Sequence, residues 1–486
     1  MRWWERPAGF PRITTYGLAA MSGLLLFLSD FPVHAWPLQA VALLPWLLAL
    51  VRLRPGLWTG LGAGSLLGFC YTFPLALALE FPLLLGMGLA VYLTLLWALV
   101  SLGATYLLRG PPLLAALGVG AVAVVLEWVD MSLVPVWGTA QVFTRVWSAS
   151  PWTIQLVSVT GVTGLVLVLV TGQTLMAMAL VRSDVRRRAA VALAVLIVVA
   201  AGANTVLWPS KPKSTVRVAA VGWTWDHLPR GKHSSWKLLY DTVYQRLVRR
   251  AVAQGAGLIV SPEAAFKVPG HRRKAFQKAL SFTARAYRVW LAVGYFDNAR
   301  NRNQLVFVDA RGRMRGEYTK SHLIPTLERY TAGDGSGVTV RGPGFRLGGM
   351  ICQDDNFTDL ARGYGRRGVE VVALPTNDWR QVRNHHLENS LFRAVENRYA
   401  IVRAASNGIS VIVSARGEVL GRRNHFAEGP GAVVVDLPLY QAGSFYARMG
   451  DWLVILCGLF LVFGQVWGWR RRLRRARGAG KNRSTT

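Results

Sequence analysis

Apolar segments long enough to cross a lipid bilayer occupy most of the first 208 residues of this 486-residue chain. A helix needs about 20 apolar residues to span the hydrocarbon core, where irregular backbone would lack hydrogen-bond partners. Hydrophobic residues make up 52% of the chain and its mean hydropathy is +0.29, which excludes an ordinary soluble protein. We predict an α-helical polytopic membrane bundle of about eight spans, near residues 13–31, 36–52, 56–75, 81–108, 111–129, 154–181, 189–208 and 451–469.

Basic residues stand at every second boundary between these spans. They precede the first span and follow the second, fourth, sixth and eighth, as Arg52 and Arg54, Arg109, Arg186–Arg188 and Arg470–Arg472. Short cytoplasmic loops of membrane proteins accumulate lysine and arginine. The alternation therefore predicts that both termini are cytoplasmic and that the long segment 209–450 lies on the outer face of the membrane.

The outer segment changes character after Trp208-Pro-Ser-Lys-Pro-Lys213. Short β-branched runs there alternate with helical stretches, which predicts an α/β domain with its own core. The expected organisation is a transmembrane domain over 1–208 with about seven helices, the α/β domain over 209–450, a C-terminal transmembrane helix over 451–469 and a basic cytoplasmic tail over 470–486.

Three reactive side chains of the outer segment each stand where an extended run ends. Glu263 follows Gly257-Leu-Ile-Val-Ser261, Lys320 follows Tyr318-Thr319, and Cys352 ends the run from Gly344. A nucleophilic thiol needs a base or a cation beside it, because at neutral pH a cysteine is mostly protonated. Glu263 can accept the proton of Cys352, and Lys320 can stabilise the oxyanion that forms on a carbonyl.

Each member of this trio also has an ordinary structural interpretation. A lone cysteine is often a buried hydrophobe, a Pro-Glu pair often caps a helix, and a lysine is usually solvated. The other two cysteines, Cys70 and Cys457, fall within predicted spans, so Cys352 has no disulfide partner. A free thiol is unusual in an oxidising compartment, and here it follows a carboxylate and an amine along the chain. Together these features favour a catalytic role for the trio.

The chain resembles the bacterial apolipoprotein N-acyltransferases, polytopic membrane enzymes with an extracytoplasmic nitrilase-type carbon-nitrogen hydrolase domain. The resemblance covers nearly the whole length. It rests on Phe31-Pro-Val-His-Ala-Trp36, Leu126-Glu127-Trp128, Asn377-Asp378-Trp379, Arg393-Ala-Val-Glu396-Asn-Arg398 and Phe445-Tyr446-Ala-Arg448-Met-Gly-Asp-Trp452.

The resemblance implies a nitrilase-type α-β-β-α sandwich in which Glu263 is the base, Lys320 is the catalytic lysine and Cys352 is the nucleophile. It also implies a supporting role for Glu328, in Lys320-Ser-His322-Leu-Ile-Pro325-Thr-Leu-Glu328. The implied reaction is a ping-pong transfer without a cofactor, in the bacterial cytoplasmic (inner) membrane. Cys352 takes the sn-1 acyl chain of a phospholipid, typically phosphatidylethanolamine, as a thioester, and the N-terminal amine of a diacylglyceryl-cysteine apolipoprotein then accepts it. We expect a monomer.

The residues after Cys352 depart from the usual pattern of the family. The family usually has Tyr-Glu there, whereas this chain has Gln353 and Asp354, which keeps a carboxylate but shortens it and removes the aromatic ring. We expect the backbone N–H of Gln353 to be a second oxyanion donor and Asp354 to support the site. These changes surround the expected acyl pocket, so they bear on substrate choice more than on the transfer chemistry.

Tryptophan and basic residues crowd together between Trp223 and Lys237, a mixture suited to the membrane interface. We expect Trp223 and Trp225, or a comparable apolar loop near Glu328, to form a movable gate at the membrane surface. The alternative is an ordinary loop that packs on the core of the domain. His322, His385 and His386 repeat no metal-ligand spacing, so we predict no metal.

The outer segment is strongly basic, which bears on its partners. It has about 37 lysines and arginines against about 18 acidic residues. The positive electrostatic field of such a segment concentrates anionic phospholipid head groups. Nucleic acid is a poor alternative, because no recognisable nucleic-acid-binding fold is present. Two other functions stay open: a membrane-anchored nitrilase-type amidase that uses water as acceptor, and a non-catalytic membrane scaffold or lipid transporter.

Overall fold

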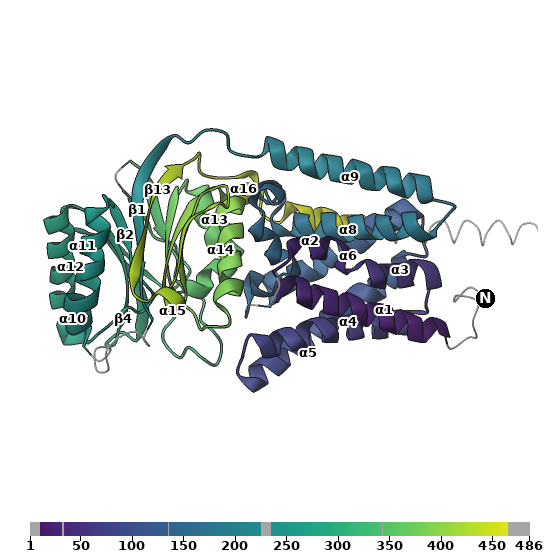
Figure 1. Ribbon diagram of the computed structural model, residues 1–486, viewed down its shortest axis with the longest axis horizontal. Coiled ribbons are helices and arrows are strands. Elements are labelled where there is room, and N and C mark those ends of the chain that lie inside the picture. The colour runs from purple at the N-terminus through teal and green to yellow at the C-terminus, as the bar shows by residue number, and fades with distance from the viewer. Residues whose placement is uncertain (1–9, 32–33, 135, 225–234, 343, 465–486) are drawn as a thin grey trace, which may run out of the picture. The chain divides into compact units, whose positions relative to one another are not determined.

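The computed structural model describes residues 10–31, 34–134, 136–224, 235–342 and 344–464 (Figure 1). The chain divides into two compact units that interleave along the sequence. The membrane unit comprises Met1–Val129, Val162–Gly202 and Asp451–Thr486, and the α/β unit comprises Asp130–Gly161 and Ala203–Gly450.

Seven helical segments of the described chain are long and apolar enough to cross a membrane. They confirm a polytopic helical bundle. One of them, Trp36–Leu53, consists of two helices that meet at Leu43, and the apolar helix Trp452–Gly464 is shorter than a full span within the described residues. The helices of this part of the chain are α1 (Phe10–Asp30), α2 (Trp36–Ala42), α3 (Leu44–Leu53), α4 (Leu57–Ala78), α5 (Leu83–Leu107), α6 (Pro112–Trp128), α8 (Val162–Val181) and α9 (Arg186–Val206).

Small residues set the packing of α4 against α5. Gly60, Gly64 and Gly68 repeat at every fourth position of α4, and a Cβ added to Gly64 would lie 2.3 Å from the Cβ of Ser101. Glycine at this spacing lets two membrane helices approach closely, which replaces the hydrophobic driving force that lipid cannot supply. A hydrogen bond of 3.1 Å from the indole of Trp46 to the Ser101 hydroxyl ties α3 to the same contact.

Two β-sheets form the centre of the α/β unit. In the described residues, the first sheet has the strand order β13-β1-β2-β4-β5-β6, with β3 paired to β4, and the second has the order β12-β11-β10-β9-β8-β7. The strands are β1 (Ser214–Gly222), β2 (Leu258–Val260), β3 (Phe266–Val268), β4 (Trp290–Asp297), β5 (Arg302–Val308), β6 (Met314–Thr319), β7 (Thr339–Arg341), β8 (Arg346–Gly349), β9 (Val371–Asn377), β10 (Ala400–Ser406), β11 (Ile409–Val413), β12 (Val419–Asn424) and β13 (Gly431–Leu439).

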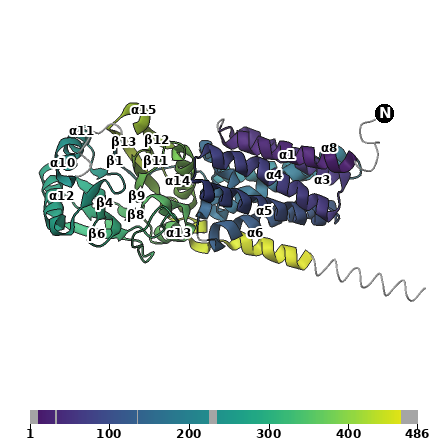
Figure 2. The same cartoon turned by 90° about the horizontal axis from the view of Figure 1, so that it is seen from below.

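Helices cover the outer face of each sheet, so the α/β unit is an α-β-β-α sandwich, as expected (Figures 1 and 2). Both faces of β1 are buried, which is why the sheet is covered on both sides. Val218 and Ala220 enter the core between the sheets, while Ala219 and Val221 enter the core beneath the helices. The helices and helical turns are α10 (Trp236–Leu239), η6 (Tyr240–Tyr244), α11 (Gln245–Ala253), η7 (Gly270–Arg272), α12 (Arg273–Tyr287), η8 (Cys352–Asn356), α13 (Thr358–Arg366), α14 (Arg383–Asn397), α15 (His425–Glu428) and α16 (Phe445–Met449).

Residues 130–161, here named the connecting segment, do not continue the membrane helices. They form the short turns η1 (Val129–Leu133), η2 (Gly138–Gln141), η3 (Phe143–Ala149), η4 (Pro151–Thr153) and α7 (Val157–Thr160). The prediction of a sixth span over 154–181 is therefore wrong at its start. Gly161 has φ +69, which interrupts the apolar run, and α8 begins at Val162.

Buried polar contacts hold the connecting segment in the α/β unit. The guanidinium of Arg398 donates to the Gln155 side chain at 2.6 Å and to the Ser158 hydroxyl at 2.8 Å. Gly138, at φ +55, lies so close to η8 that an added Cβ would be 2.4 Å from the Asn356 carbonyl oxygen. The α/β unit is thus built from two stretches of sequence, which differs from the single stretch 209–450 expected from the sequence.

Candidate active site

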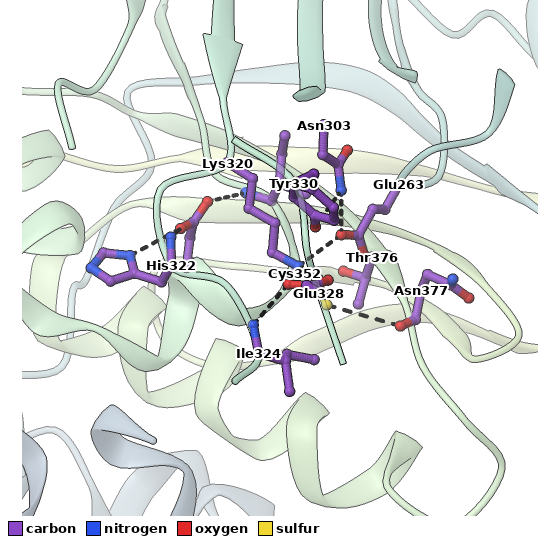
Figure 3. A network of polar contacts seen from close by, with 12 residues as sticks. Glu263, Asn303, Lys320, His322, Ile324, Glu328, Tyr330, Cys352, Thr376 and Asn377 are labelled. Atoms are coloured by element: carbon purple, nitrogen blue, oxygen red, sulfur yellow. Dashed lines mark hydrogen bonds and ion pairs between the residues drawn. The ribbon is translucent and has the colours of Figure 1, made fainter. Parts of the chain in front are cut away.

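The ends of three strands bring Glu263, Lys320 and Cys352 together between the two sheets (Figure 3). Glu263 follows β2, Lys320 directly follows β6, and Cys352 opens the helical turn η8 after β8. Two of these strands belong to the first sheet and the third to the second. The cluster thus depends on the packing of the sheets, although each residue is placed by its own strand.

Lys320 lies between two carboxylates. Its Nζ is 2.9 Å from Oε1 of Glu263 and 2.7 Å from Oε1 of Glu328, and its side chain is fully buried. The second carboxylate oxygen of Glu328 accepts a hydrogen bond of 2.8 Å from the Ile324 N–H. Glu328, itself fixed by the backbone of Ile324, therefore provides Lys320 with a second anionic partner besides Glu263.

Cys352 has an unusual backbone conformation, with φ +51 and an exposure of 3%. Non-glycine residues adopt this region seldom, and they do so at sites where the surrounding structure fixes them. The Sγ atom lies 3.9 Å from the carbonyl oxygen of Asn377, at the end of β9. The turn thus directs the thiol toward the ends of the strands.

Burial and neighbouring charges shift the pKa values of the three residues in the cluster. Burial raises the pKa of the Cys352 thiol well above its usual value, and the Glu263 charge raises it further. Burial also raises the pKa of Glu263, against the effect of Lys320. For Lys320, burial lowers the pKa, but the charges of Glu263, Cys352, Tyr330 and Glu328 outweigh it and the pKa is raised. The raised pKa values of Cys352 and Lys320 favour a protonated thiol beside an ammonium group in the resting site.

Sequence reasoning missed Asn303 and Tyr330, which complete the contacts of Glu263. The Asn303 amide donates to Oε1 of Glu263 at 2.7 Å and to the Tyr330 hydroxyl at 3.2 Å. Asn303 stands in the polar start of β5, Arg302-Asn303-Gln304, so the sequence pattern does not distinguish it. It fixes the carboxylate oxygen that also faces Lys320.

Asp354 supports the site from behind rather than facing the thiol. Its fully buried carboxylate accepts hydrogen bonds from Ile351 N–H, Ser321 N–H, His322 N–H, the Tyr318 hydroxyl and the His322 ring, at 2.8 to 3.2 Å. These donors flank Lys320 on both sides in sequence and include the residue just before Cys352. Asp354 therefore ties the lysine loop to the cysteine turn.

The side chain of Gln353 points to the connecting segment. Its Nε2 donates a hydrogen bond of 2.9 Å to the Val136 carbonyl oxygen, and the Thr139 hydroxyl donates one of 2.9 Å to the Asn356 carbonyl oxygen. Both ends of η8 are thus bonded to the same segment. The glutamine that replaces the family's usual tyrosine has a definite structural partner.

We expect Gln353→Ala to lower the free energy of unfolding by about 1 kcal/mol, because it removes the hydrogen bond to the partly buried Val136 carbonyl. Thermal unfolding in detergent measures the change. The matched control is Gln254→Ala, since Gln254 also donates to a backbone carbonyl but is exposed. Equal, negligible losses in both variants would contradict a supporting role for Gln353.

The gate expected at Trp223 is wrong for that residue. Trp223 is fully buried and packs in the core with Phe266, at a ring-centroid distance of 6.4 Å, so it cannot lie at a membrane surface. Trp225 lies outside the described residues. In the other stretch considered, near Glu328, Leu327 is 48% exposed. An interfacial loop, if one serves the site, is better sought there.

Distance alone would allow Cys352, Asp378 and His386 to share a metal ion, because their donor atoms lie within 4.8 Å of one another. The chemistry fits poorly. Both ring nitrogens of His386 face carboxylates, and the guanidinium of Arg403 lies 3.1 Å from one of them. A resident cation would meet a positive charge already in place, so the absence of a metal remains our prediction.

Several known proteins are similar to parts of this chain or to nearly all of it. Residues 217–445 match the Carbon-nitrogen hydrolase family. An apolipoprotein N-acyltransferase of Geobacter metallireducens is 26% identical over 91% of this chain and 93% of its own length, and one of Synechocystis is 25% identical over 46% and 47%. A solved amidase from a Nesterenkonia species is 24% identical, covering 49% of this chain and 94% of its own, at a TM-score of 0.39.

The full-length match includes both the membrane helices and the sandwich that carries the Glu263, Lys320 and Cys352 cluster. A carbon-nitrogen hydrolase domain alone would leave the helices unexplained. The chain is a multi-pass membrane protein that is similar over nearly its whole length to an apolipoprotein N-acyltransferase.

Proposed function

We propose that this enzyme moves an acyl chain from a phospholipid to the N-terminal amine of diacylglyceryl-cysteine in an apolipoprotein, through a thioester on Cys352. The observation that carries the proposal is the buried contact of Lys320 with Glu263, beside a free thiol, in a chain that also has seven candidate membrane spans. The phospholipid is expected to be phosphatidylethanolamine. The product belongs to lipoprotein maturation.

In the first half-reaction, Glu263 accepts the thiol proton as Sγ of Cys352 attacks the sn-1 ester carbonyl. The negative charge that develops on the carbonyl oxygen is stabilised by Nζ of Lys320 and by the N–H of Gln353. The C–O bond of the ester breaks, and the protonated Glu263 returns its proton to the departing alkoxide. A lysophospholipid leaves, and the acyl chain remains on sulfur.

In the second half-reaction, the amine of the lipoprotein attacks the thioester carbonyl. Glu263 takes a proton from the attacking nitrogen as the amide bond forms, and it passes that proton to the sulfur as the C–S bond breaks, which regenerates the thiol and the carboxylate. Lys320 and the Gln353 N–H stabilise the same oxyanion position in both steps. Because the lysine is held by Glu328 as well, it keeps its place while Glu263 changes protonation.

The connectivity of the chain supports the proposed membrane orientation. The two parts of the α/β unit, Asp130–Gly161 and Ala203–Gly450, are joined by α8 and α9. Two crossings return a chain to the side from which it started, so both parts can lie on one face. Arg186–Arg188, the first residues of α9, then lie on the opposite face, which is the cytoplasmic one by the positive-inside tendency.

Intact-protein mass spectrometry tests the proposal. Incubation with phosphatidylethanolamine is expected to add one acyl mass to Cys352, and a diacylglyceryl-cysteine peptide is expected to remove it as the N-acylated product. Glu263→Gln should slow acylation by about 100-fold or more. Release of free fatty acid without acylated peptide would instead assign a hydrolase that uses water, and no acyl mass on Cys352 would reject the thioester route.

A further inference from the structure

A buried group of four charged side chains lies behind Cys352 and has no part in the proposed reaction. His386, on α14, has Nδ1 2.7 Å from Oδ1 of Asp378 and Nε2 3.1 Å from Oδ1 of Asp355. The guanidinium of Arg403, on β10, donates to Oδ2 of Asp378 at 2.8 Å. The Ser390 hydroxyl, one turn after His386, donates to Asp355 at 2.5 Å.

These contacts join the two backbone segments that flank the thiol. Asp355 belongs to η8, the turn that Cys352 opens, and Asp378 follows Asn377, whose carbonyl oxygen is 3.9 Å from Sγ. His386 bridges both segments with one ring. The donor atoms of Cys352, Asp378 and His386 lie within 4.8 Å of one another, so charges on the histidine and the aspartate act directly on the sulfur.

The group is electrically balanced when His386 is protonated. Burial lowers the pKa of His386, but Asp355 and Asp378 outweigh it and raise the pKa to about 9, against the opposing charge of Arg403. The pKa of Asp378 is lowered, because Arg403 and His386 outweigh its burial. Two carboxylates then face two cations, and an unbalanced charge in such a buried place would be costly.

We propose that His386 is a positioning residue that ties the cysteine turn to the Asn377–Asp378 segment and, with Arg403, cancels the negative charge of Asp378 beside the sulfur. The inference rests on the proposed role of Cys352 as nucleophile. Without the imidazolium, the group would carry one net negative charge. Formation of a thiolate, and of an oxyanion next to it, would then be disfavoured.

The rate of Cys352 alkylation by iodoacetamide, followed across pH by intact mass, tests this proposal without any turnover. Cys70→Ser and Cys457→Ser in the background make the signal specific to Cys352. We expect His386→Gln to move the alkylation midpoint up by about one pH unit and Asp378→Asn to move it down. The double variant, in which Asp355 and Arg403 balance, should return close to the parental midpoint.

Ser390→Ala is the matched control, because it removes one hydrogen bond to Asp355 without changing any charge. It should leave the midpoint in place. A midpoint in His386→Gln equal to the parental one, or a double variant shifted as far as His386→Gln alone, would overturn the proposal. If His386→Gln is not recovered folded, Asp378→Asn and the double variant test the proposal. A parental midpoint in Asp378→Asn, or a double variant whose midpoint is not close to the parental one, would reject charge cancellation. The parental alkylation would remain measurable even if the acyl-transfer function were wrong.

Discussion

Replacing Cys352 with serine is expected to lower acyl transfer by about 10,000-fold while leaving the protein folded. A serine hydroxyl is far less ionised than a thiol, and the ring nitrogens of the nearby His386 are bonded to Asp378 and Asp355 rather than placed to take a proton from position 352. Burial already raises the pKa of the thiol well above its usual value, so the site depends on the intrinsic acidity and nucleophilicity of sulfur. The same environment would disfavour an alkoxide far more.

Transfer from phosphatidylethanolamine to a diacylglyceryl-cysteine peptide, measured with thermal unfolding on the same preparations, checks this result. Cys70→Ser and Cys457→Ser provide matched controls, since both thiols lie in the membrane unit. We expect both controls to retain nearly parental rates. Comparable losses in all three variants, or substantial turnover by the Cys352 variant, would remove the basis for a covalent thioester.

Lys320→Met is expected to reduce thioester formation by about 1,000-fold. The substitution removes the oxyanion donor and also leaves Glu263 and Glu328, which now share the ammonium at 2.9 and 2.7 Å, without the cation between them. Two buried carboxylates that lose their common cation cannot both stay ionised, so one takes up a proton. If Glu263 is protonated, the site loses its base together with its electrostatic stabilisation.

The single-turnover rate of acyl-Cys352 formation as a function of pH separates these two losses. Loss of the oxyanion donor lowers the rate at every pH, whereas protonation of Glu263 moves the acidic limb of the profile to higher pH. Lys267→Met is the control, because Lys267 is an exposed lysine on β3 of the same sheet. A parental rate of thioester formation in Lys320→Met would exclude the role proposed for this lysine.

The sequence allowed much of the fold and the central residues of the site to be predicted, for physical reasons that are local. A membrane span and a buried strand each have a hydrophobic pattern that can be recognised within one segment. Glu263, Lys320 and Cys352 each stand at the end of such a segment, so their common location could be inferred before any packing was known. Asp354 and Gln353 could be placed near the site only because they follow Cys352.

Other features depend on contacts between distant segments and escaped sequence reasoning. Trp223 was expected at the membrane surface because of its basic neighbours in sequence, but the strand β1 that precedes it carries it into the core beside Phe266. The pairing of His386 with Asp355 and Asp378 joins a helix, a turn and a strand end, which no single pattern links. A series of short helical turns such as the connecting segment is likewise hard to recognise in the sequence when its apolar residues continue those of the next helix.

The connecting segment has a consequence for the order in which the enzyme is made. Residues 130–161 leave the ribosome before α8, α9 and the whole of Ala203–Gly450, yet they supply the Val136 and Thr139 contacts to the two ends of η8. A soluble fragment cut at Ala203 would therefore lack part of its own interior, and would expose Gln353, Asn356 and Arg398 to solvent where the intact chain buries them. The contacts of η8 with Val136 and Thr139 can form only after η8, which is two membrane helices downstream, has folded back onto the connecting segment.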